Sequence, residues 1–172
     1  YPKTNFCPSY YEAGLFLKAT FKGVEGNYCL AMPVTSDMAM AVGREEFGYP
    51  KKLADIELKH RRNSVKGYIE RHGVRFFEVS AQLTGKPTSK DFPTLMSSKE
   101  KDGSIFNYNF KYFLSPDEKA FDYDPRLVRG KVIFRHKLVK WGDAEVKLSS
   151  SKYDPWAEVE VVKTLGTVYT VG

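Results

Sequence analysis

The chain has 172 residues, a formal net charge of +6 and a sequence pI of about 9.2. Its 42% hydrophobic and 15% aromatic content excludes a disordered chain, and its length suits one domain with a real core, so we expect a single domain over residues 1–172. The basic residues are spread singly between apolar ones, as in KVIFRHKLVKW (131–141), without an RNP-type motif or zinc-finger spacing, and we expect no nucleic-acid partner.

Strand-like alternation dominates the sequence. Leu15, Leu17, Ala19 and Phe21 share one side of a predicted strand, which leads through the turn KGVEGN (22–27) into a return strand at residues 28–34. Further predicted strands cover residues 54–60, 64–71, 74–83, 105–113, 130–141, 145–148 and 157–162. Turns are expected at residues 72–73, 115–119, 141–143 and 153–155, and a long loop at 84–103.

One helix is clearly indicated. Ser36 is a good N-cap, and Met38, Ala41, Val42 and Glu45 share a face of the helix that follows. The helix can end at Gly48, and Pro50 prevents its continuation. The fold class we expect is mainly β (α+β), a closed or nearly closed antiparallel β-barrel with one or two packed helices.

The adjacent lysines of YPKKL (49–53) follow that helix. Lysines near a helix C-terminus interact favourably with its dipole, by about 0.3 to 1 kcal/mol, which would be a sufficient structural reason for the pair. If the segment is extended, however, Lys51 lies on one side with Tyr49 and Leu53, and Lys52 points to the other. Lys51 then has the apolar neighbours, a setting that suits a nucleophile.

A lysine attacks a carbonyl only as the free amine, and with an ordinary pKa near 10.4 only about one molecule in 2,500 is neutral at pH 7. To make the amine common at neutral pH, the ammonium must be disfavoured by about 4.6 kcal/mol. A second ammonium about 10 Å away supplies about 1.7 kcal/mol at an effective dielectric near 20, whereas burial shifts a lysine by about three to five units. We therefore expect desolvation of Lys51 to be the larger effect and Lys52 the smaller.

The stretch GNYCLAMPVTSDMAMAVGREEFGYPKKL (26–53) resembles the acetoacetate decarboxylase superfamily, whose motif joins a G-D/N-Y strand, a helix ending in A-V-G-R-E and then Y-P-K-K-L. The upstream YYEAGLFLKATFKGVEGNY (10–28) aligns with the family without gaps. Downstream, FDYDPRLVRGKVIF (121–134) and YDPWAEVEVV (153–162) resemble its later strands through weaker motifs, so the resemblance covers essentially the whole chain.

The resemblance implies roles for individual residues. Lys51 matches the Schiff-base lysine and Lys52 its supporting cationic neighbour, and activation of such a lysine by desolvation or a nearby cation is a known feature of the family. Glu12 matches an active-site carboxylate suited to proton transfer or substrate positioning. Met32 and Tyr49 match substrate-binding positions in the pocket. Arg44, in the G-R-E sequence, is expected to have a structural role at the helix end.

The implied reaction is decarboxylation of a β-keto acid such as acetoacetate. The amine of Lys51 forms an imine with the ketone, the imine accepts the electrons when carbon dioxide leaves, and protonation and hydrolysis release a ketone. No cofactor and no metal are needed. The expected partners are a small keto-acid substrate and, as in the family, further copies of the same chain in a homo-oligomer.

The family's substrate-orienting arginine and a second acidic residue come from an N-terminal portion with no counterpart before Tyr1. We expect that segment to be missing here or supplied separately, and Arg126 or Arg129 would be only a weak substitute for the arginine. The apolar stretches are too short to span a bilayer, and YPKTNF (1–6) has no signal-peptide core. With Cys7 and Cys29 showing no disulfide framework, we expect a cytoplasmic protein without a membrane partner.

Other candidates have simpler interpretations. His60, His72 and His136 show no metal-ligand spacing, and His136 alternates with Phe134 and Leu138 as a core or pocket residue would. Two alternatives to decarboxylation remain open. The same imine chemistry could serve aldol condensation or dehydration, or the chain could be a β-barrel that binds an apolar small molecule without turnover.

Overall fold

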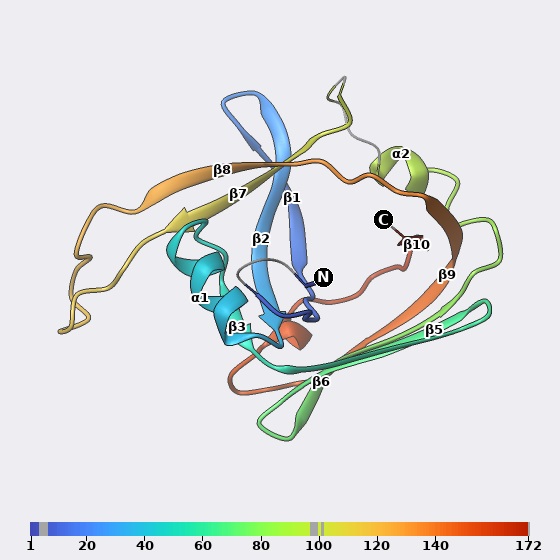
Figure 1. Ribbon diagram of the computed structural model, residues 1–172, viewed down its shortest axis with the longest axis horizontal. Helices are drawn as coiled ribbons and strands as arrows, with labels where there is room; N and C mark the ends of the chain where they lie inside the picture. Colours follow the sequence, from blue (N-terminus) through green and yellow to red (C-terminus); the bar gives the residue numbers. More distant parts are fainter. Residues whose placement is uncertain (4–6, 97–99, 101, 172) are drawn as a thin grey trace. The chain divides into compact units, whose positions relative to one another are not determined.

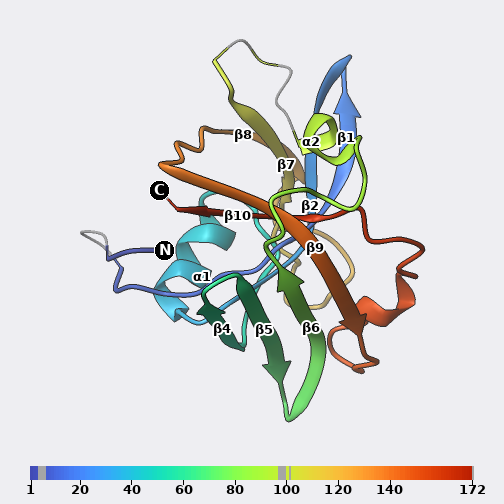
Figure 2. The same ribbon diagram turned by 90° about the vertical axis from the view of Figure 1, so that its right-hand side faces the viewer.

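The computed structural model describes residues 1–3, 7–96, 100 and 102–171 and divides into two compact units. The first unit comprises Tyr1–Leu53 with Lys99–Ile133, and the second comprises Ala54–Ser98 with Phe134–Gly172. Each unit is built on one five-stranded sheet, whose strands are labelled in Figures 1 and 2. The predicted predominance of β-structure is therefore confirmed.

The sheet of the first unit contains five strands, which are β1 (Leu15–Phe21), β2 (Val24–Val34), β7 (Ile105–Lys111) and β8 (Arg126–Val132) in that order, with β3 (Lys51–Leu53) also paired to β2. β2 runs parallel to both β3 and β7, so the prediction of a wholly antiparallel sheet is wrong for this unit. The helix between β2 and β3 returns the chain to the same end of β2, which makes a parallel pair possible.

The hairpin turn between β1 and β2 is shorter than predicted. Only Lys22 and Gly23 form it, with φ of 49° and 77°. Two successive positive φ angles match the right-handed twist of the flanking strands, so pairing begins immediately at Phe21 and Val24. Residues 24–27, expected in the turn, therefore belong to β2.

Helix α1 (Asp37–Glu45) begins where the sequence predicts it. The Ser36 Oγ accepts a hydrogen bond from the backbone N–H of Ala39 at 3.3 Å, which satisfies one of the unpaired donors of the first turn. Gly48 lies just beyond the helix with φ of 70°, a conformation that glycine adopts without strain.

The buried face of α1 is not the face formed by Met38, Ala41, Val42 and Glu45. Three of these four are exposed, and Val42 is half-buried, whereas Ala39 and Gly43 are buried. These two residues are four positions apart and therefore lie on one side of the helix. Their small size lets the helix approach the strands closely, so the size of the side chains rather than their hydrophobicity decides which face of α1 is buried.

The sheet of the second unit has the order β10 (Thr167–Val171), β9 (Leu138–Leu148), β6 (Val74–Gln82), β5 (Ser64–Arg71) and β4 (Asp55–Arg61). The predicted meander of β4, β5 and β6 is confirmed, and Figure 2 shows these strands side by side with a curved β9. Among the described residues, β10 and β4 end the sheet without pairing to each other, so it is an open half-barrel and a closed barrel is not confirmed. The two edge strands are in contact through side chains: the ring of His60 on β4 stacks on the ring of Tyr169 on β10, with centroids 4.5 Å apart.

The predicted turn at residues 141–143 is wrong, because β9 runs through these residues without a break. Gly142 is buried inside the strand, where a Cβ would lie 2.0 Å from the carbonyl oxygen of Gln82. Glycine is therefore needed here for the close approach of β6 and β9 rather than for a turn.

Three other predicted segments differ. The strand expected at 130–141 is interrupted, because β8 ends at Val132 and β9 begins at Leu138. Of the strand expected at 157–162, the first two residues lie in the 3₁₀ helix η1 (Trp156–Glu158) and residues 159–162 form no strand, while Trp156 packs edge-on against Phe76 with ring centroids 5.1 Å apart. The loop at 84–103 contains a short helix, α2 (Phe92–Met96), and residues 97–99 and 101 of that loop lie outside the described residues.

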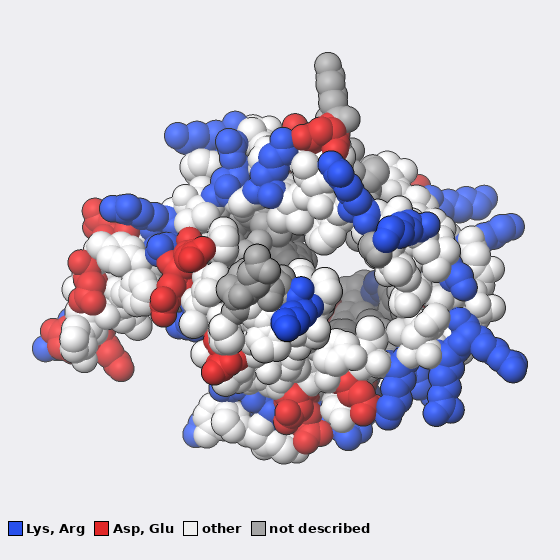
Figure 3. All heavy atoms as spheres, in the orientation of Figure 1, with Lys and Arg blue, Asp and Glu red and all other residues white. Residues whose placement is uncertain are grey.

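The loop between β7 and β8 carries much of the exposed acid of the first unit. Its exposed acidic side chains, seen at the left of Figure 3, are those of Asp117, Glu118, Asp122 and Asp124. Exposed aromatic side chains, including Phe113 and Phe121, lie between them in the sequence. The loop therefore contributes charge and surface rather than core. Within the described part of the chain, no helix is long and apolar enough to cross a membrane.

We expect Gly142→Ala to lower the free energy of unfolding by about 3 kcal/mol or more, because the new methyl group must displace the backbone of β6. Gly130→Ala is the matched control, since a Cβ there would meet only ordinary contacts at 3.9 Å and beyond, and we expect a change below about 1 kcal/mol. Urea unfolding measures both. Equal stability of the two variants would mean that β6 and β9 do not approach as closely as described.

Candidate active site

Lys51 opens β3 and is buried, with 6% of its surface exposed. β3 pairs in parallel with β2 so that Lys51 lies opposite Met32, which is also buried. Residues in register on neighbouring strands project to the same face of a sheet, so these two side chains share one face. The predicted burial of Lys51 is confirmed, and Met32 lies beside it.

Helix α1 lies against the Lys51 side chain. A Cβ at Gly43 would be 2.5 Å from Cε and 3.0 Å from Nζ of Lys51, so the lysine occupies the space that a side chain at position 43 would need. The guanidinium of Arg44 donates a hydrogen bond to the backbone carbonyl of Lys51 at 3.1 Å. Arg44 thus ties the end of α1 to the start of β3, which is the structural role expected of it.

Glu12 provides the counter-ion of Lys51. It lies on the other flank of β2, where it forms an antiparallel bridge with Val34, and its carboxylate Oε2 forms an ion pair with Nζ of Lys51. The two side chains are only 9% and 8% exposed. The sequence predicted an apolar niche for Lys51, and the structure adds a carboxylate in direct contact with its Nζ.

Two tyrosine rings flank the ammonium. Nζ of Lys51 lies 5.8 Å from the ring centroid of Tyr10 and 5.9 Å from that of Tyr49, within the range of cation–π attraction. Burial, followed by the charge of Glu12, raises the pKa of Tyr10 to about 12. The same two causes raise the pKa of Tyr1, whose ring stacks on Tyr10, above its ordinary value. Both phenols therefore stay protonated near neutral pH.

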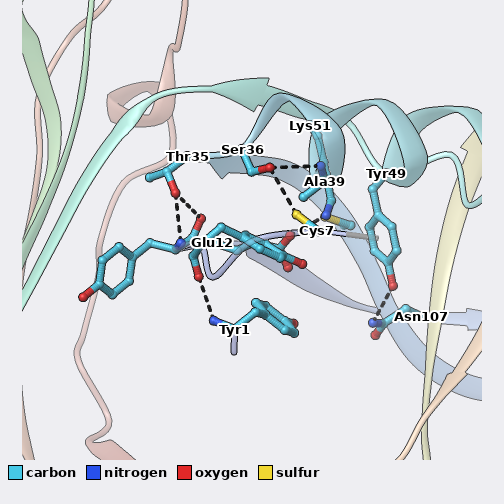
Figure 4. Close-up of polar contacts among 12 residues, drawn as sticks. Tyr1, Cys7, Glu12, Thr35, Ser36, Ala39, Tyr49, Lys51 and Asn107 are labelled. Atoms are coloured by element: carbon cyan, nitrogen blue, oxygen red, sulfur yellow. Dashed lines mark hydrogen bonds and ion pairs between the residues drawn. The ribbon is translucent and has the colours of Figure 1, made fainter. Parts of the chain in front are cut away.

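The structure brings four of the five predicted site residues together. Glu12 and Tyr49 contact Lys51, and Met32 lies in register with it on β2; Figure 4 shows Glu12, Tyr49 and Lys51. Lys52 alternates to the other side of β3 and is exposed. Leu53 is 44% exposed, so the expected apolar neighbour of Lys51 is replaced by Gly43 and the tyrosine rings.

Two contributors were not predicted. Tyr10 is two residues from Glu12, and this period-two spacing was the signal that could have placed both on one side. Asn107 of β7 donates a hydrogen bond from its side-chain amide to the hydroxyl of Tyr49 at 3.1 Å, and nothing in the local sequence indicates this contact. Because β7 is more than fifty residues away along the chain, only the parallel pairing of β7 with β2 brings it near.

Cys29 is a buried free cysteine whose thiol is influenced by the charges of Glu12 and Lys51. Burial, followed by the charge of Glu12, raises the pKa of Cys29 to about 12, although Lys51 acts in the opposite direction. The thiolate is the reactive form of cysteine. Cys29 therefore remains a neutral thiol near pH 7, the less reactive form of cysteine.

The histidines lie elsewhere in the described chain. His60 and His72 make ring contacts with Tyr169 and Tyr153 in the second unit. His136, expected in a core or pocket, is exposed and stacks on Phe134, which is also exposed. The expectation for His136 is wrong because residues 133–137 lie between strands rather than in one.

Comparison with known proteins supports a family assignment. A sequence model of the family described as "Acetoacetate decarboxylase (ADC)" matches residues 1–172. The chain is 30% identical over 176 residues to the "CLA biosynthesis isomerase" of Lactiplantibacillus plantarum, which covers 97% of this chain and 63% of that protein. It is 31% identical over 164 residues to "Acetoacetate decarboxylase 2" of Mesorhizobium japonicum, which covers 95% of this chain and 60% of that protein.

The fold is shared with a solved structure. The crystal structure of acetoacetate decarboxylase from Legionella pneumophila matches with a TM-score of 0.79 at 19% identity, over 95% of this chain and 62% of that chain. The present chain therefore spans less than two thirds of the length of each of these three proteins.

We expect Glu12→Gln to lower the free energy of unfolding by about 3 kcal/mol at neutral pH, because it leaves the buried ammonium of Lys51 without its counter-charge. Adding Lys51→Met should restore most of the loss, since the charge is then removed as well. The control is Glu57→Gln, which breaks the exposed pair with Lys59 and should cost less than about 1 kcal/mol. Urea unfolding measures all three, and equal losses in Glu12→Gln and Glu57→Gln would contradict a buried pair.

Proposed function

The chain belongs to the acetoacetate decarboxylase family, and from that premise we propose that it is a Schiff-base-forming lyase that decarboxylates a β-keto acid through an imine on Lys51. The observation that carries the proposal is the buried contact between Nζ of Lys51 and the carboxylate of Glu12. An enclosed lysine in contact with a carboxylate has a proton acceptor beside it, which can take the proton that the amine must lose before it attacks. An exposed lysine would exchange its proton with water instead.

The first steps use this pair directly. The proton moves from Nζ of Lys51 to the carboxylate of Glu12, leaving a neutral amine whose lone pair attacks the ketone carbon of the substrate. The resulting carbinolamine loses its hydroxyl group as water, with Glu12 returning a proton to the departing oxygen. A protonated imine and a Glu12 carboxylate remain, next to the carboxylate that the bound keto acid still carries.

The carbon–carbon bond then breaks. The electron pair of the bond to the substrate carboxylate moves toward the iminium nitrogen, carbon dioxide leaves and an enamine forms. Water supplies a proton to the enamine carbon, and hydrolysis of the iminium that forms releases a ketone and the Lys51 amine. The iminium nitrogen is the electron sink, so the proposed route uses no metal and no organic cofactor.

The remaining site residues have supporting roles in this proposal. Tyr49 and Met32 would form walls of the substrate site, because one faces Nζ of Lys51 and the other is in register with it. Lys52 would add positive potential from the outer side of β3, which attracts an anionic keto acid. The substrate class is thus a small keto acid, and further copies of the chain would assemble into a homo-oligomer as the resemblance implies.

Isomerisation is the second candidate, and the similarity to a protein named as an isomerase over 97% of this chain favours it. An imine on Lys51 also acidifies the neighbouring carbon, so Glu12 could remove a proton there and return it at another position. The same imine would equally serve condensation or dehydration. These reactions share the attack by Lys51 and differ in the step that follows.

Borohydride trapping tests the proposal. When acetoacetate and borohydride are added together, the reduced adduct should be found on Lys51 by mass spectrometry of peptides. When acetoacetate is added without borohydride, acetone should be released. Lys51→Arg keeps the positive charge but forms no imine, so we expect no adduct and at least a thousandfold loss of activity. Lys18→Arg, on the exposed part of β1, is the control and should behave like the parent chain.

The products separate the two candidate reactions. An adduct on Lys51 together with acetone supports decarboxylation, and an adduct with an isomerised substrate but no acetone supports isomerisation. Absence of any adduct at Lys51 in the parent chain rules out both forms of the proposal.

A further inference from the structure

Two asparagines of β7 hold the segment that leads into Lys51. Asn107 and Asn109 are two residues apart on one strand, so their side chains project to the same face. The amide nitrogen of Asn107 donates to the hydroxyl of Tyr49 at 3.1 Å, and that of Asn109 donates to the backbone carbonyl of Phe47, also at 3.1 Å. Both acceptors belong to the short connection between α1 and β3.

This connection rests directly on the backbone of β7. A Cβ at Gly48 would lie 3.0 Å from the backbone nitrogen of Lys111 and from the carbonyl oxygen of Phe110. Gly48 also has a positive φ of 70°, so this position strongly favours glycine. The connection is therefore held by a close backbone approach on β7 in addition to the two asparagine hydrogen bonds.

Asn109 is an unusual residue to keep at this position. It is 1% exposed, and its side-chain oxygen has no hydrogen-bond partner within the described residues. Burying an unpaired amide oxygen costs about 1 to 3 kcal/mol, which an apolar residue of similar shape would avoid. An asparagine is nevertheless useful here, because its amide nitrogen donates the hydrogen bond to the backbone carbonyl of Phe47.

The direction of the Asn107 hydrogen bond determines what Tyr49 can do. Because the amide N–H of Asn107 donates to the phenol oxygen, the single O–H proton of Tyr49 points elsewhere. The ring of Tyr49 already faces Nζ of Lys51. The phenol proton is thus not used by Asn107 and can be donated to another acceptor.

We propose that Asn107 and Asn109 are positioning residues of the Lys51 site: Asn109 fixes the connection into β3, and Asn107 turns the Tyr49 hydroxyl into a hydrogen-bond donor for an oxygen of the keto acid. The second half rests on the proposed function. The two residues act through Phe47 and Tyr49 and do not themselves touch the substrate.

The variant Asn107→Asp tests the donor direction, because the introduced carboxylate is nearly the same size but only accepts hydrogen bonds. It should capture the Tyr49 proton and raise the acetoacetate concentration that gives half-maximal borohydride trapping at Lys51 by about tenfold, the loss of one hydrogen bond. Tyr49→Phe should raise it by a similar factor. Adding Asn107→Asp to Tyr49→Phe should then cause no further change, whereas an unrelated structural defect would add to it.

Asn63→Asp, in an exposed turn of the second unit, is the matched control for the added charge and should leave trapping unchanged. Circular dichroism establishes that each variant is folded. An unchanged or lower half-saturation in Asn107→Asp would mean that Tyr49 donates to position 107, and it would overturn the proposed orientation. Additive effects of Asn107→Asp and Tyr49→Phe would overturn it as well.

Amide hydrogen exchange tests Asn109 without any substrate. Asn109→Leu should speed exchange of the backbone amides of residues 51–53 by about tenfold while leaving those of β5 and β6 unchanged. Unchanged exchange at residues 51–53 would overturn the role of Asn109. If the parent chain forms no adduct at Lys51, the proposed function fails together with the substrate contact of Tyr49, and the exchange result still decides whether Asn109 holds the connection.

Discussion

The buried ion pair between Lys51 and Glu12 is the constraint around which the first unit is organised. Removing two charges from water costs several kcal/mol for each ion, and only direct contact with the opposite charge offsets that cost. The partners are 39 positions apart in the sequence. They meet because β2 lies between their segments, pairing with Lys51 through Met32 and with Glu12 through Val34.

The residues around the ion pair leave room for the long side chain of Lys51 in an enclosed site. Gly43 leaves the volume that Lys51 fills, and Gly48 permits the connection to lie against the backbone of β7. Polar groups then fix the backbone on both sides, with Arg44 on the carbonyl of Lys51 and Asn109 on that of Phe47. The site is therefore held by strands and a helix rather than by a free loop, which suits the precise placement that catalysis requires.

A neutral pair has a chemical advantage for the proposed reaction. When the proton moves from the lysine to the carboxylate, two charges disappear together, and when the iminium forms, two charges reappear together. The attack and dehydration steps therefore leave the net charge of the pair unchanged, and the later loss of carbon dioxide removes the iminium charge together with the charge of the substrate carboxylate. A lysine activated by burial alone would have no such acceptor for its proton.

The sequence by itself determined the local features of this protein. Alternation located most strands, Ser36 and Gly48 located the helix, and the YPKKL motif identified Lys51 and its resemblance to a decarboxylase family. These features depend on neighbours along the chain, so a local pattern is enough to reveal them. Glu12, Met32 and Tyr49 were named only through the resemblance, since alternation alone does not say which strands are adjacent.

Tertiary structure decided the rest, because those features depend on which distant segments become neighbours. The parallel pairing of β2 with β3 and β7, the burial of Ala39 and Gly43 instead of the expected helix face, and the contact of Asn107 with Tyr49 all arise from long-range packing. Gly142 shows the same limit most simply. From the sequence, Gly142 suggests a turn. The structure shows instead that the carbonyl of Gln82 on β6 lies so close to Gly142 that no side chain would fit there.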